Sequence, residues 1–451
     1  GALDDPVAIR SLKRFMTEQE TEIQVPEVRH NPQNAARKIA IIGSGPAGLS
    51  CAYFLARLGY KPVIFEKEPC PGGMLVQAIP AYRLPREELG REISMIESLG
   101  VTIKTGSALG RDFTLTDLRE QGFEAVFLGV GAPQGLRLGV PGERGEGVTE
   151  ALAFLREYNV NGTVHVGQRV VVVGGGNSAI DAARTARRLG AEHVTILYRR
   201  QRDQMPAWTE EVIAADEEGI TLLELTAPKQ ILRDAHKRVV GVLCQRMALG
   251  DYDRSGRRRP VAGRNPDFTV PCDQVIVAVG QSLEAAPLIG DLPVELKDGW
   301  VKADRRTGAT SVEWLFAGGD AVTGPASVVE AVGAGERAAV GIDQYLTGAN
   351  HAFWRRETPV DVEFDPDADP VPTPRARVVC LDPDLRVCTF EEVELSWDLE
   401  TAVAEAKRCL RCDYGKVPAA GEGATDALAA KAAAATAPAQ ARQATAQIEV
   451  N

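Results

Sequence analysis

The stretch VVVVGGGNSAIDAARTARRLG, residues 170–190, has the form of a dinucleotide-binding loop: a valine strand, three glycines and a helix beginning near Asn177. The stretch KIAIIGSGPAGLSCAYFLARLG, residues 38–59, has the same form earlier in the chain. In such loops the tight turn, the approach of backbone to pyrophosphate and the packing of helix on strand each exclude a side chain. The chain therefore has two candidate dinucleotide sites, and both predict doubly wound α/β structure.

The region around these loops extends the α/β pattern. From residue 37 to about 350, strands rich in Val and Ile alternate with amphipathic helices, which predicts parallel sheets covered by helices. At 451 residues the chain exceeds one core of ordinary size, so two or three domains are expected.

The two ends of the chain differ from this body. Residues 1–36 are predicted to form a charged helical arm and a proline-marked linker, with an apolar stripe that needs another surface to cover it: Leu3, Val7, Ile9, Leu12 and Phe15. Beyond 350 the sequence becomes Pro- and Asp-rich, then predicts a helix over 398–410. The Ala-rich end has too few large apolar groups to form its own core.

Charge and cysteine content exclude several classes of protein. A net charge of −11 and a pI near 5.2 argue against nucleic-acid or acidic-lipid partners. The eight cysteines are scattered, and only Cys409 and Cys412 lie close together, which suits a reducing compartment, interpreted as cytoplasm. The N-terminal residues resemble no secretory signal, and apolar runs fall far below the ~18 residues of a membrane span.

The first loop favours an unphosphorylated ribose. Gly43, Gly45 and Gly48 have the spacing GxGxxG, and the following strand, KPVIFEKE, ends in Glu66, 23 residues after Gly43. A carboxylate there can accept two ribose hydroxyls, as in FAD or NAD. The alternative is a purely structural turn, which the combination of strand, loop, helix, second strand and acid disfavours.

The second loop points to a nicotinamide coenzyme. Gly174 and Gly176 are followed by Ala179 in the third place, and the next strand ends in Tyr198-Arg199-Arg200 instead of an acid. Guanidinium groups there can hold a 2′-phosphate, which favours NADP and leaves NAD open. The alternative is that both arginines are a solvated strand end.

A third element indicates which loop holds the flavin. Residues 314–346 read as a short strand ending in Gly318-Gly319-Asp320, a loop, and a helix that begins near Ser327. Asp320 can hold flavin-side hydroxyls, and the amides of Ser327 and Val328 can stabilise negative charge at flavin N1 and O2. A plain strand–helix crossover is the alternative.

Several motifs in the same order resemble the flavin-dependent NAD(P)H oxidoreductases typified by the small subunit of bacterial glutamate synthase, related to the pyridine-nucleotide disulfide reductases. Besides the glycine loops, the resemblance rests on PGGMLVQAIPAYRLP (71–85), YRRQRDQMPA (198–207), LGDYDRSGRRRPV (249–261), VIVAVGQ (275–281) and LFAGGDAVTGPASVVEAVGAGERAA (315–339). It covers about residues 1–415.

The resemblance implies two Rossmann-like domains, with the NAD(P) domain inserted into a split FAD domain. The implied divisions are a helical arm and linker (1–36), FAD-binding parts (37–155 and 281–350), an NAD(P)-binding domain (156–280), a C-terminal extension (351–417) and the Ala-rich tail (418–451). The expected cofactor-binding residues are Gly43, Gly45, Pro46, Ala47, Gly48, Glu66, Gly73, Met74, Leu75, Arg83, Gly131, Gly174, Gly176, Asn177, Ser178, Arg199, Arg200, Gly280, Gly319, Asp320, Ser327 and Val328. No catalytic acid or base is expected, because hydride transfer between stacked rings needs none.

Two departures from the family pattern concern cysteines. Relatives usually begin with a cysteine-rich iron–sulfur domain, and no cysteine precedes LDDPVAIRSLKRF here, so either the clusters are lost or the numbering starts after them. In the predicted flavin and nicotinamide domains no two cysteines lie a few residues apart as in a redox disulfide: Cys51 and Cys70 are 19 apart, and Cys244 and Cys272 are 28 apart. Cys409-Leu-Arg-Cys412 is half of an iron–sulfur or zinc site, interpreted more readily as a remnant than as a cluster. No metal site is therefore expected.

The favoured function is an FAD-containing electron-transfer subunit that exchanges electrons between NAD(P)(H) and iron–sulfur clusters of partner subunits. The resemblance allows glutamate-synthase-like, formate-dehydrogenase-like, or tungsten or molybdenum aldehyde oxidoreductase partners. A stand-alone NAD(P)H:ferredoxin-type reductase and a non-catalytic flavin-bound scaffold are the alternatives. The intact second loop argues against the scaffold.

Overall fold

The chain folds as two units in the computed structural model, which describes residues 5–20, 26–253, 256–355 and 373–409. The larger unit comprises Ile23–Thr358 and Cys380–Glu394. The smaller unit comprises Gly1–Glu22, Pro359–Val379 and Leu395–Asn451. Each unit has its own core, so each is described by itself.

The first sheet of the larger unit has five parallel strands in the order β18-β4-β1-β2-β3. The strands are β1 (Ile39–Ile42), β2 (Val63–Phe65), β3 (Thr102–Lys104), β4 (Ala125–Leu128) and β18 (Leu315–Ala317). Every residue of β1 and β4 is buried, since parallel sheets are covered on both faces. Strand β18 pairs with β4 and completes this sheet only after the second sheet has been formed along the chain.

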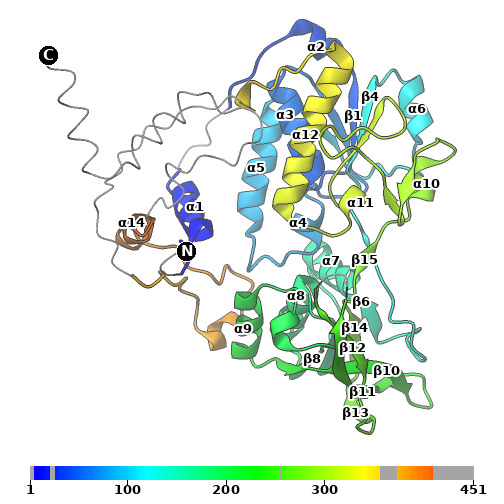
Figure 1. Cartoon of the computed structure of the whole chain (residues 1–451), viewed down its shortest axis with the longest axis vertical. Helices are drawn as coiled ribbons and strands as arrows, with labels where there is room; N and C mark the ends of the chain where they lie inside the picture. Colours follow the sequence, from blue (N-terminus) through cyan, green and yellow to red (C-terminus); the bar gives the residue numbers. More distant parts are fainter. Residues whose placement is uncertain (1–4, 21–25, 254–255, 356–372, 410–451) are drawn as a thin grey trace, which may run out of the picture. The chain divides into compact units, whose positions relative to one another are not determined.

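Three long helices cover one face of the first sheet. They are α3 (Pro46–Arg57), α5 (Arg86–Ser98) and α12 (Val328–Thr347), and Figure 1 shows them side by side. Leu55, Ile93 and Ile342 pack there against the strands. The shorter elements of this half are α2 (Pro32–Ala36), α4 (Met74–Gln77), α6 (Leu115–Glu120), α10 (Ala286–Ile289), α11 (Asp320–Thr323), the 3₁₀ helix η2 (Phe353–Arg355), and the paired strands β16 (Leu296–Lys297) and β17 (Trp300–Val301).

The second sheet has the order β6-β14-β7-β8-β9, again with every pair parallel. Its strands are β6 (Val148–Glu150), β7 (Arg169–Val173), β8 (His193–Leu197), β9 (Thr221–Leu223) and β14 (Gln274–Val277). The predicted α/β fold with two Rossmann-like sheets is therefore confirmed.

The second sheet is covered differently on its two faces. Three helices line one face: α7 (Ala151–Asn161), α8 (Asn177–Arg188) and α9 (Thr209–Glu217). The other face packs against an antiparallel sheet through a cluster that includes Val171 and Val242. That sheet consists of β10 (Thr226–Arg233), β11 (Val239–Tyr252), β12 (Arg258–Ala262) and β13 (Phe268–Pro271).

The chain crosses between the sheets twice, and at the crossing β5 (Gln134–Gly135) pairs with β15 (Gln281–Ser282). The first crossing lies earlier than the predicted division at 155/156, which falls inside α7. Strand β6 pairs with β14, and Phe154 belongs to the second core. The residues of β6 are Val-Thr-Glu, too few and too polar to be recognised as a strand from the sequence.

The smaller unit joins segments from both ends of the chain. Helix α1 (Ile9–Glu18) packs against α14 (Leu399–Lys407), and Phe15 is buried with Trp397 and Ala402. The expectation that the N-terminal stripe needs another surface is thus met by this chain's own C-terminal helix. Ile9 is 61% exposed, so it lies outside the buried stripe, and Leu3 lies outside the described residues.

A buried carboxylate links the segments of the smaller unit. Glu405 on α14 accepts hydrogen bonds from the backbone N–H of Ala8 and of Ala376, each at 2.8 Å, and pairs with Arg408 at 2.7 Å. Asp398 caps α14 by accepting from the N–H of Thr401 at 2.7 Å. The helix predicted over 398–410 therefore begins as expected and ends earlier, at Lys407.

The remaining described segment, residues 380–394, belongs to the larger unit and contains α13 (Pro383–Arg386). Residues 410–451, which include Cys412 and the Ala-rich tail, lie outside the described residues. Among the helices that the structure describes, none combines the length and apolar character required to cross a bilayer.

Candidate functional site

The first glycine loop has one glycine for each structural requirement. Gly43 has φ +95°, and a Cβ there would lie 2.5 Å from the carbonyl O of Gly129. A Cβ on Gly48 would lie 1.9 Å from the carbonyl O of Gly43, so this glycine lets α3 approach the strand. Gly45 precedes α3 with φ −69°, and the nearest atom to its Cβ would be 3.9 Å away. Of these three glycines, only Gly45 could carry a side chain without a clash with the protein. Its backbone is therefore left open to a ligand, which fits the close approach of a pyrophosphate.

Glu66 stands at the end of β2 beside this loop. The carboxylate is 4% exposed and accepts from the N–H of Ser44 at 2.8 Å and from its Oγ at 2.5 Å. Its other oxygen accepts from the N–H of Glu68 at 2.9 Å. A carboxylate at this position fits an unphosphorylated ribose, and its unexpected second task is to hold the loop through Ser44.

Two further segments meet the first loop. Gly73, with φ +56°, lies so close that its Cβ would be 2.6 Å from Cα of Gly45, and Met74 and Leu75 begin α4 directly after it. Gly319, with φ +67°, would place a Cβ 2.9 Å from Cβ of Ala47. The structure therefore brings the expected flavin-side residues of three distant segments to the N-terminus of α3.

The N-terminus of α12 adjoins this group. Ser327 caps the helix in a capping box with Glu330, and Val328 is the first helical residue. A Cβ on Gly335 would lie 2.2 Å from the carbonyl O of Ala47, so α12 packs directly on the loop helix. Gly335 was not among the expected residues, and the sequence signal for it is the pair of glycines in GAGERAA. Pro46 is the first residue of α3, and Gly131 follows β4 with φ +66°.

Asp320 should make FAD binding depend on pH. Burial raises the pKa of Asp320 to about 6, against the lowering effect of the Ala326 N–H bond. Hydroxyl donors bind the ionised carboxylate better, so FAD affinity should rise with pH through this value and fall about tenfold between roughly pH 7 and pH 5. Titration of the apoprotein with FAD, followed by flavin fluorescence, measures this. Asp320→Asn should remove the slope, and tighter binding at acid pH would contradict a contact of Asp320 with FAD.

The second glycine loop repeats the geometry of the first. Gly174 has φ +151°, and its Cβ would lie 2.3 Å from the carbonyl O of Ala278. Gly176 precedes α8 with φ −91°, and its Cβ would meet only Cγ of Pro206, at 4.0 Å. Ala179, in the third glycine's place, is fully buried. The backbone at Gly176 is thus open as at Gly45, which fits a second dinucleotide.

Asn177 and Ser178, the first residues of α8, follow the second loop directly. Asn177 accepts a hydrogen bond from the N–H of Trp208 at 3.1 Å through Oδ1, which holds the segment after η1 (Arg202–Gln204) beside α8. Ser178 is half-buried in the first turn of α8. Gly280, with φ +136°, follows β14.

The two arginines after β8 have different environments. Arg199 is exposed. Arg200 is 6% exposed, pairs with Asp253 at 2.8 Å and donates through Nε to the carbonyl O of Arg258 at 2.9 Å. Arg200 therefore holds the β11–β12 hairpin, and Arg199 is the one with a guanidinium exposed toward solvent. Asp253 is separated from Arg200 by 53 residues, so no local sequence signal could have identified this pair.

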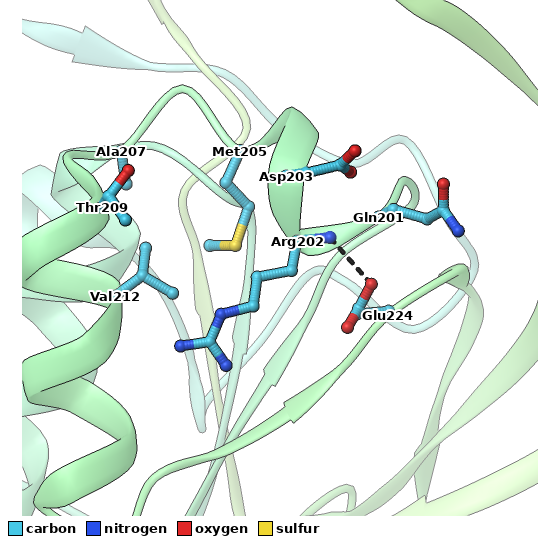
Figure 2. Close-up of a pocket in the computed structure, with 8 residues that line it drawn as sticks. All are labelled: Gln201, Arg202, Asp203, Met205, Ala207, Thr209, Val212 and Glu224. Atoms are coloured by element: carbon cyan, nitrogen blue, oxygen red, sulfur yellow. Dashed lines mark hydrogen bonds between the residues drawn. The ribbon is translucent and has the colours of Figure 1, made fainter. Parts of the chain in front are cut away.

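A cavity of about 430 Å³ adjoins the second loop (Figure 2). Its lining comes from the end of β8, η1, α9 and the end of β9: Gln201, Arg202, Asp203, Met205, Ala207, Thr209, Val212 and Glu224. The backbone N–H of Arg202 donates to Glu224 at 2.7 Å, and its guanidinium pairs with Asp216. The lining is mixed polar and apolar, and the N–H of Ala207 joins it to the second loop by donating to the carbonyl O of Gly175 at 3.2 Å.

Arg83, expected to bind a cofactor, is engaged elsewhere. Its guanidinium pairs with Asp181 at 2.7 Å and with Glu211 at 3.1 Å. Both carboxylates belong to helices of the second sheet, a placement that the motif PAYRLP did not reveal because Asp181 lies 98 residues away and Glu211 still further along the chain.

The cysteines that the structure describes are all free thiols. Cys51 is fully buried in α3, and burial raises the pKa of its thiol far above the usual range. Cys409 is exposed, and its expected neighbour Cys412 lies outside the described residues. No group of three or more metal-ligating side chains occurs within the described part of the chain.

Comparison with known proteins gives the same picture. A family model described as pyridine nucleotide-disulphide oxidoreductase matches residues 37–335. The beta subunit of NADP(+)-dependent formate dehydrogenase from Moorella thermoacetica is 41% identical over 94% of this chain and 64% of its own. The beta subunit of NADPH-Fe(3+) oxidoreductase from Geobacter sulfurreducens is 39% identical over 91% of this chain and 66% of its own. The chain thus spans slightly less than two thirds of these two relatives.

A third relative and two solved structures complete the comparison. The glutamate synthase [NADPH] small chain of Escherichia coli is 37% identical over 75% of each chain. Mycobacterium tuberculosis FprA in complex with NADPH superposes with a TM-score of 0.59 at 19% identity, over 69% of this chain and 85% of FprA. Thioredoxin reductase of T. acidophilum gives 0.53 at 24% identity, over 69% and 99%. Both structures share the fold.

Proposed function

Since the chain belongs to the pyridine nucleotide-disulphide oxidoreductase family, we propose that it is an FAD-containing electron-transfer subunit of a larger oxidoreductase, working between NADP(H) and iron–sulfur clusters of partner proteins. The observation that carries the proposal is the pair of glycine loops on two parallel sheets of one unit, each with one glycine that the protein itself does not require. When bound, FAD supplies the ability to take electrons in pairs from a nicotinamide and to release them singly.

The chain's own residues bind and orient the two dinucleotides. The N–H groups at the start of α3 and of α8 would bind the pyrophosphates, whose negative charge the helix dipoles favour. Glu66 and Asp320 would hold hydroxyls on the flavin side. The N–H of Ser327 donates to Glu330 at 2.9 Å in the capping box, so of the two amides predicted at the start of α12 it is that of Val328 that would stabilise negative charge at the flavin ring. The protein needs no acid or base for this work, because its task is to align two rings and exclude water.

The identities of the relatives support partner subunits. Two of them are beta subunits and one is a small chain, so each belongs to a larger assembly. For this chain we propose iron–sulfur partners, with a molybdenum or tungsten catalytic subunit as the finer possibility. A cytoplasmic location fits the free thiols among the described cysteines.

Coenzyme preference should depend on Arg199. Arg199→Ala should weaken NADPH binding about 10- to 100-fold, the usual effect of losing a charge-assisted hydrogen bond, and leave NADH binding unchanged because NADH has no 2′-phosphate. Saturation curves for flavin reduction by each coenzyme measure this. Arg200→Ala is the matched control: it should affect both coenzymes alike and lower thermal stability, since Arg200 holds the hairpin. Equal losses for both coenzymes in Arg199→Ala would exclude the 2′-phosphate role.

Anaerobic stopped-flow mixing of the FAD-loaded chain with NADPH and with NADH tests the proposal as a whole. Rapid bleaching, followed by electron release only in a complex with co-purified iron–sulfur subunits, is the expected result. Efficient turnover of the isolated chain with a soluble ferredoxin would favour a stand-alone reductase. Absence of bleaching with either coenzyme would leave the non-catalytic scaffold.

A further inference from the structure

The larger unit has a first half, built on the sheet β18-β4-β1-β2-β3, and a second half, built on the sheet β6-β14-β7-β8-β9. A short segment of the first half contacts helices of the second half. Arg83, between α4 and α5, donates through Nη1 to both carboxylate oxygens of Asp181, at 2.7 and 3.0 Å. Its Nε lies 3.1 Å from Glu211. Asp181 belongs to α8, the helix that begins at the second glycine loop, and Glu211 belongs to α9. One guanidinium thus binds two helices of the opposite half.

Tyr82, the preceding residue, is fully buried at the same place. The guanidinium carbons of Arg184 and Arg188 lie 4.8 and 3.9 Å from the centre of its ring. Both arginines pair with Glu218 at 2.6 Å, and their side chains are at most 1% exposed. The ring is therefore held against fixed, desolvated cations, a geometry that favours cation–π attraction.

The C-terminal segment 380–394 covers this contact. The N–H of Val393 donates to the carbonyl O of Tyr82 at 3.1 Å, and Nε of Arg188 donates to the carbonyl O of Thr389 at 3.1 Å. The ring of Phe390 lies 4.4 Å from that of Tyr158 on α7 and 6.3 Å from that of Tyr82. The segment consequently binds both halves of the larger unit.

The distance between the two dinucleotide sites depends on how these halves are held. The chain crosses between the sheets through β5 and β15, which are two residues each. Asn159 on α7 adds a bond to the carbonyl O of Gln77 at 3.0 Å. Ring-to-ring transfer tolerates little displacement, because a shift of about 1 Å can reduce a rate about a hundredfold.

We propose that Tyr82 and Arg83 are positioning residues, which fix the second-sheet helices against the first half so that the two bound rings meet at hydride-transfer distance. The inference rests on the proposed function. It replaces the expectation that Arg83 binds a cofactor, and it gives the extension after residue 380 a role in holding the same contact.

The test removes Arg83 together with Asp181, and Glu211 keeps its ion pair with Arg184, so no buried charge is left unpaired. Loss of Arg83 alone would strand Asp181, whereas replacing both members of a buried pair is often tolerated. We therefore compare Arg83→Met/Asp181→Asn with the unsubstituted chain. Arg355→Ala is the matched control, since Arg355 makes a two-pronged pair with Glu336 inside the first half.

In stopped-flow reduction of the FAD-loaded double variant, the limiting rate should fall by at least about tenfold. The affinity for the coenzyme should stay within about twofold of that of the unsubstituted chain, because misaligned rings slow hydride transfer without weakening binding. Thermal stability and FAD content should be retained, and Arg355→Ala should match the unsubstituted chain. An unchanged limiting rate would overturn the proposal. So would a rate loss explained by weaker coenzyme binding.

A distance measurement tests the same contact without any turnover. Glu97→Cys on α5 and Glu192→Cys after α8 provide one spin-label site in each half. The exposed native cysteines and Cys412 are replaced by serine, so that only these two positions are labelled. Pulsed electron paramagnetic resonance then measures the distance between the two labels. A narrow distribution that broadens in the double variant supports the proposal, and an unchanged distribution overturns it. If neither coenzyme reduces the unsubstituted protein, the proposed function fails, while this measurement still decides the positioning role.

Discussion

The Gly45→Ala protein is expected to fold normally and to bind FAD about 5- to 150-fold more weakly, since forcing one extra methyl into a tight contact costs about 1–3 kcal/mol. The backbone at Gly45 is extended, with φ −69°, and among the described residues the atom nearest to the added Cβ is Cα of Gly73, at 3.9 Å. Its only steric consequence falls on a ligand at the start of α3. FAD content after purification and the dissociation constant of the apoprotein measure the effect.

Gly48→Ala provides the contrast. Its Cβ would lie 1.9 Å from the carbonyl O of Gly43, so α3 must move and the apoprotein itself should lose stability. Thermal unfolding of the two apoproteins separates these effects: Gly45→Ala should match the unsubstituted chain, and Gly48→Ala should melt at a lower temperature. Normal FAD affinity in Gly45→Ala would show that the first loop does not hold the pyrophosphate.

The second large effect is expected from Gly176→Ala, which should retain FAD and lose reduction by the nicotinamide coenzyme. A Cβ at Gly176 meets only Cγ of Pro206, at 4.0 Å, so the empty fold tolerates it. A pyrophosphate at the start of α8 would be displaced, and coenzyme affinity should fall about 5- to 150-fold. Stopped-flow reduction over a range of NADPH concentrations measures this loss.

A chemical reductant supplies the control for Gly176→Ala. Dithionite needs no coenzyme site and should bleach the variant completely, at the rate found for the unsubstituted chain. Gly174→Ala, whose Cβ would lie 2.3 Å from the carbonyl O of Ala278, should instead destabilise the second sheet. Loss of FAD from Gly176→Ala would contradict the assignment of the flavin to the first loop.

The sequence predicts the two loops because their requirements are local. A positive φ at Gly43 and Gly174, and a close approach of helix to strand at Gly48, each follow from a fixed spacing within a few residues. The same holds for the start of α12, where Ser327 and Glu330 form a capping box over three residues. Short-range rules of this kind need no knowledge of what packs on the outside.

Contacts between residues far apart in the chain could not be predicted by such short-range rules. The three basic residues Arg83, Arg199 and Arg200 look alike in sequence, yet only Arg199 is exposed beside the second loop. Arg83 pairs with Asp181, 98 residues away, and Arg200 pairs with Asp253, 53 residues away. These partners determine where the two guanidinium groups lie. The role of a charged side chain depends on such partners, and neither the position of these arginines nor the family resemblance could reveal them.

The smaller unit was missed for a related reason. Each of its helices is short, and neither α1 nor α14 shows a core of its own in sequence. Their common core, including Phe15 and Trp397, forms only when the two ends of the chain meet. A pattern search along the sequence treats such segments as separate appendages.

The bond from Ala8 to Glu405 also sets an order of events during synthesis. The two residues are 397 positions apart, so at ribosomal speed the first waits about 20–80 s for the second. Throughout that time Phe15 has no α14 to cover it, while both sheets of the larger unit can be completed. On the nascent chain the smaller unit therefore folds after both sheets of the larger unit, and α1 stays without its partner helix until then.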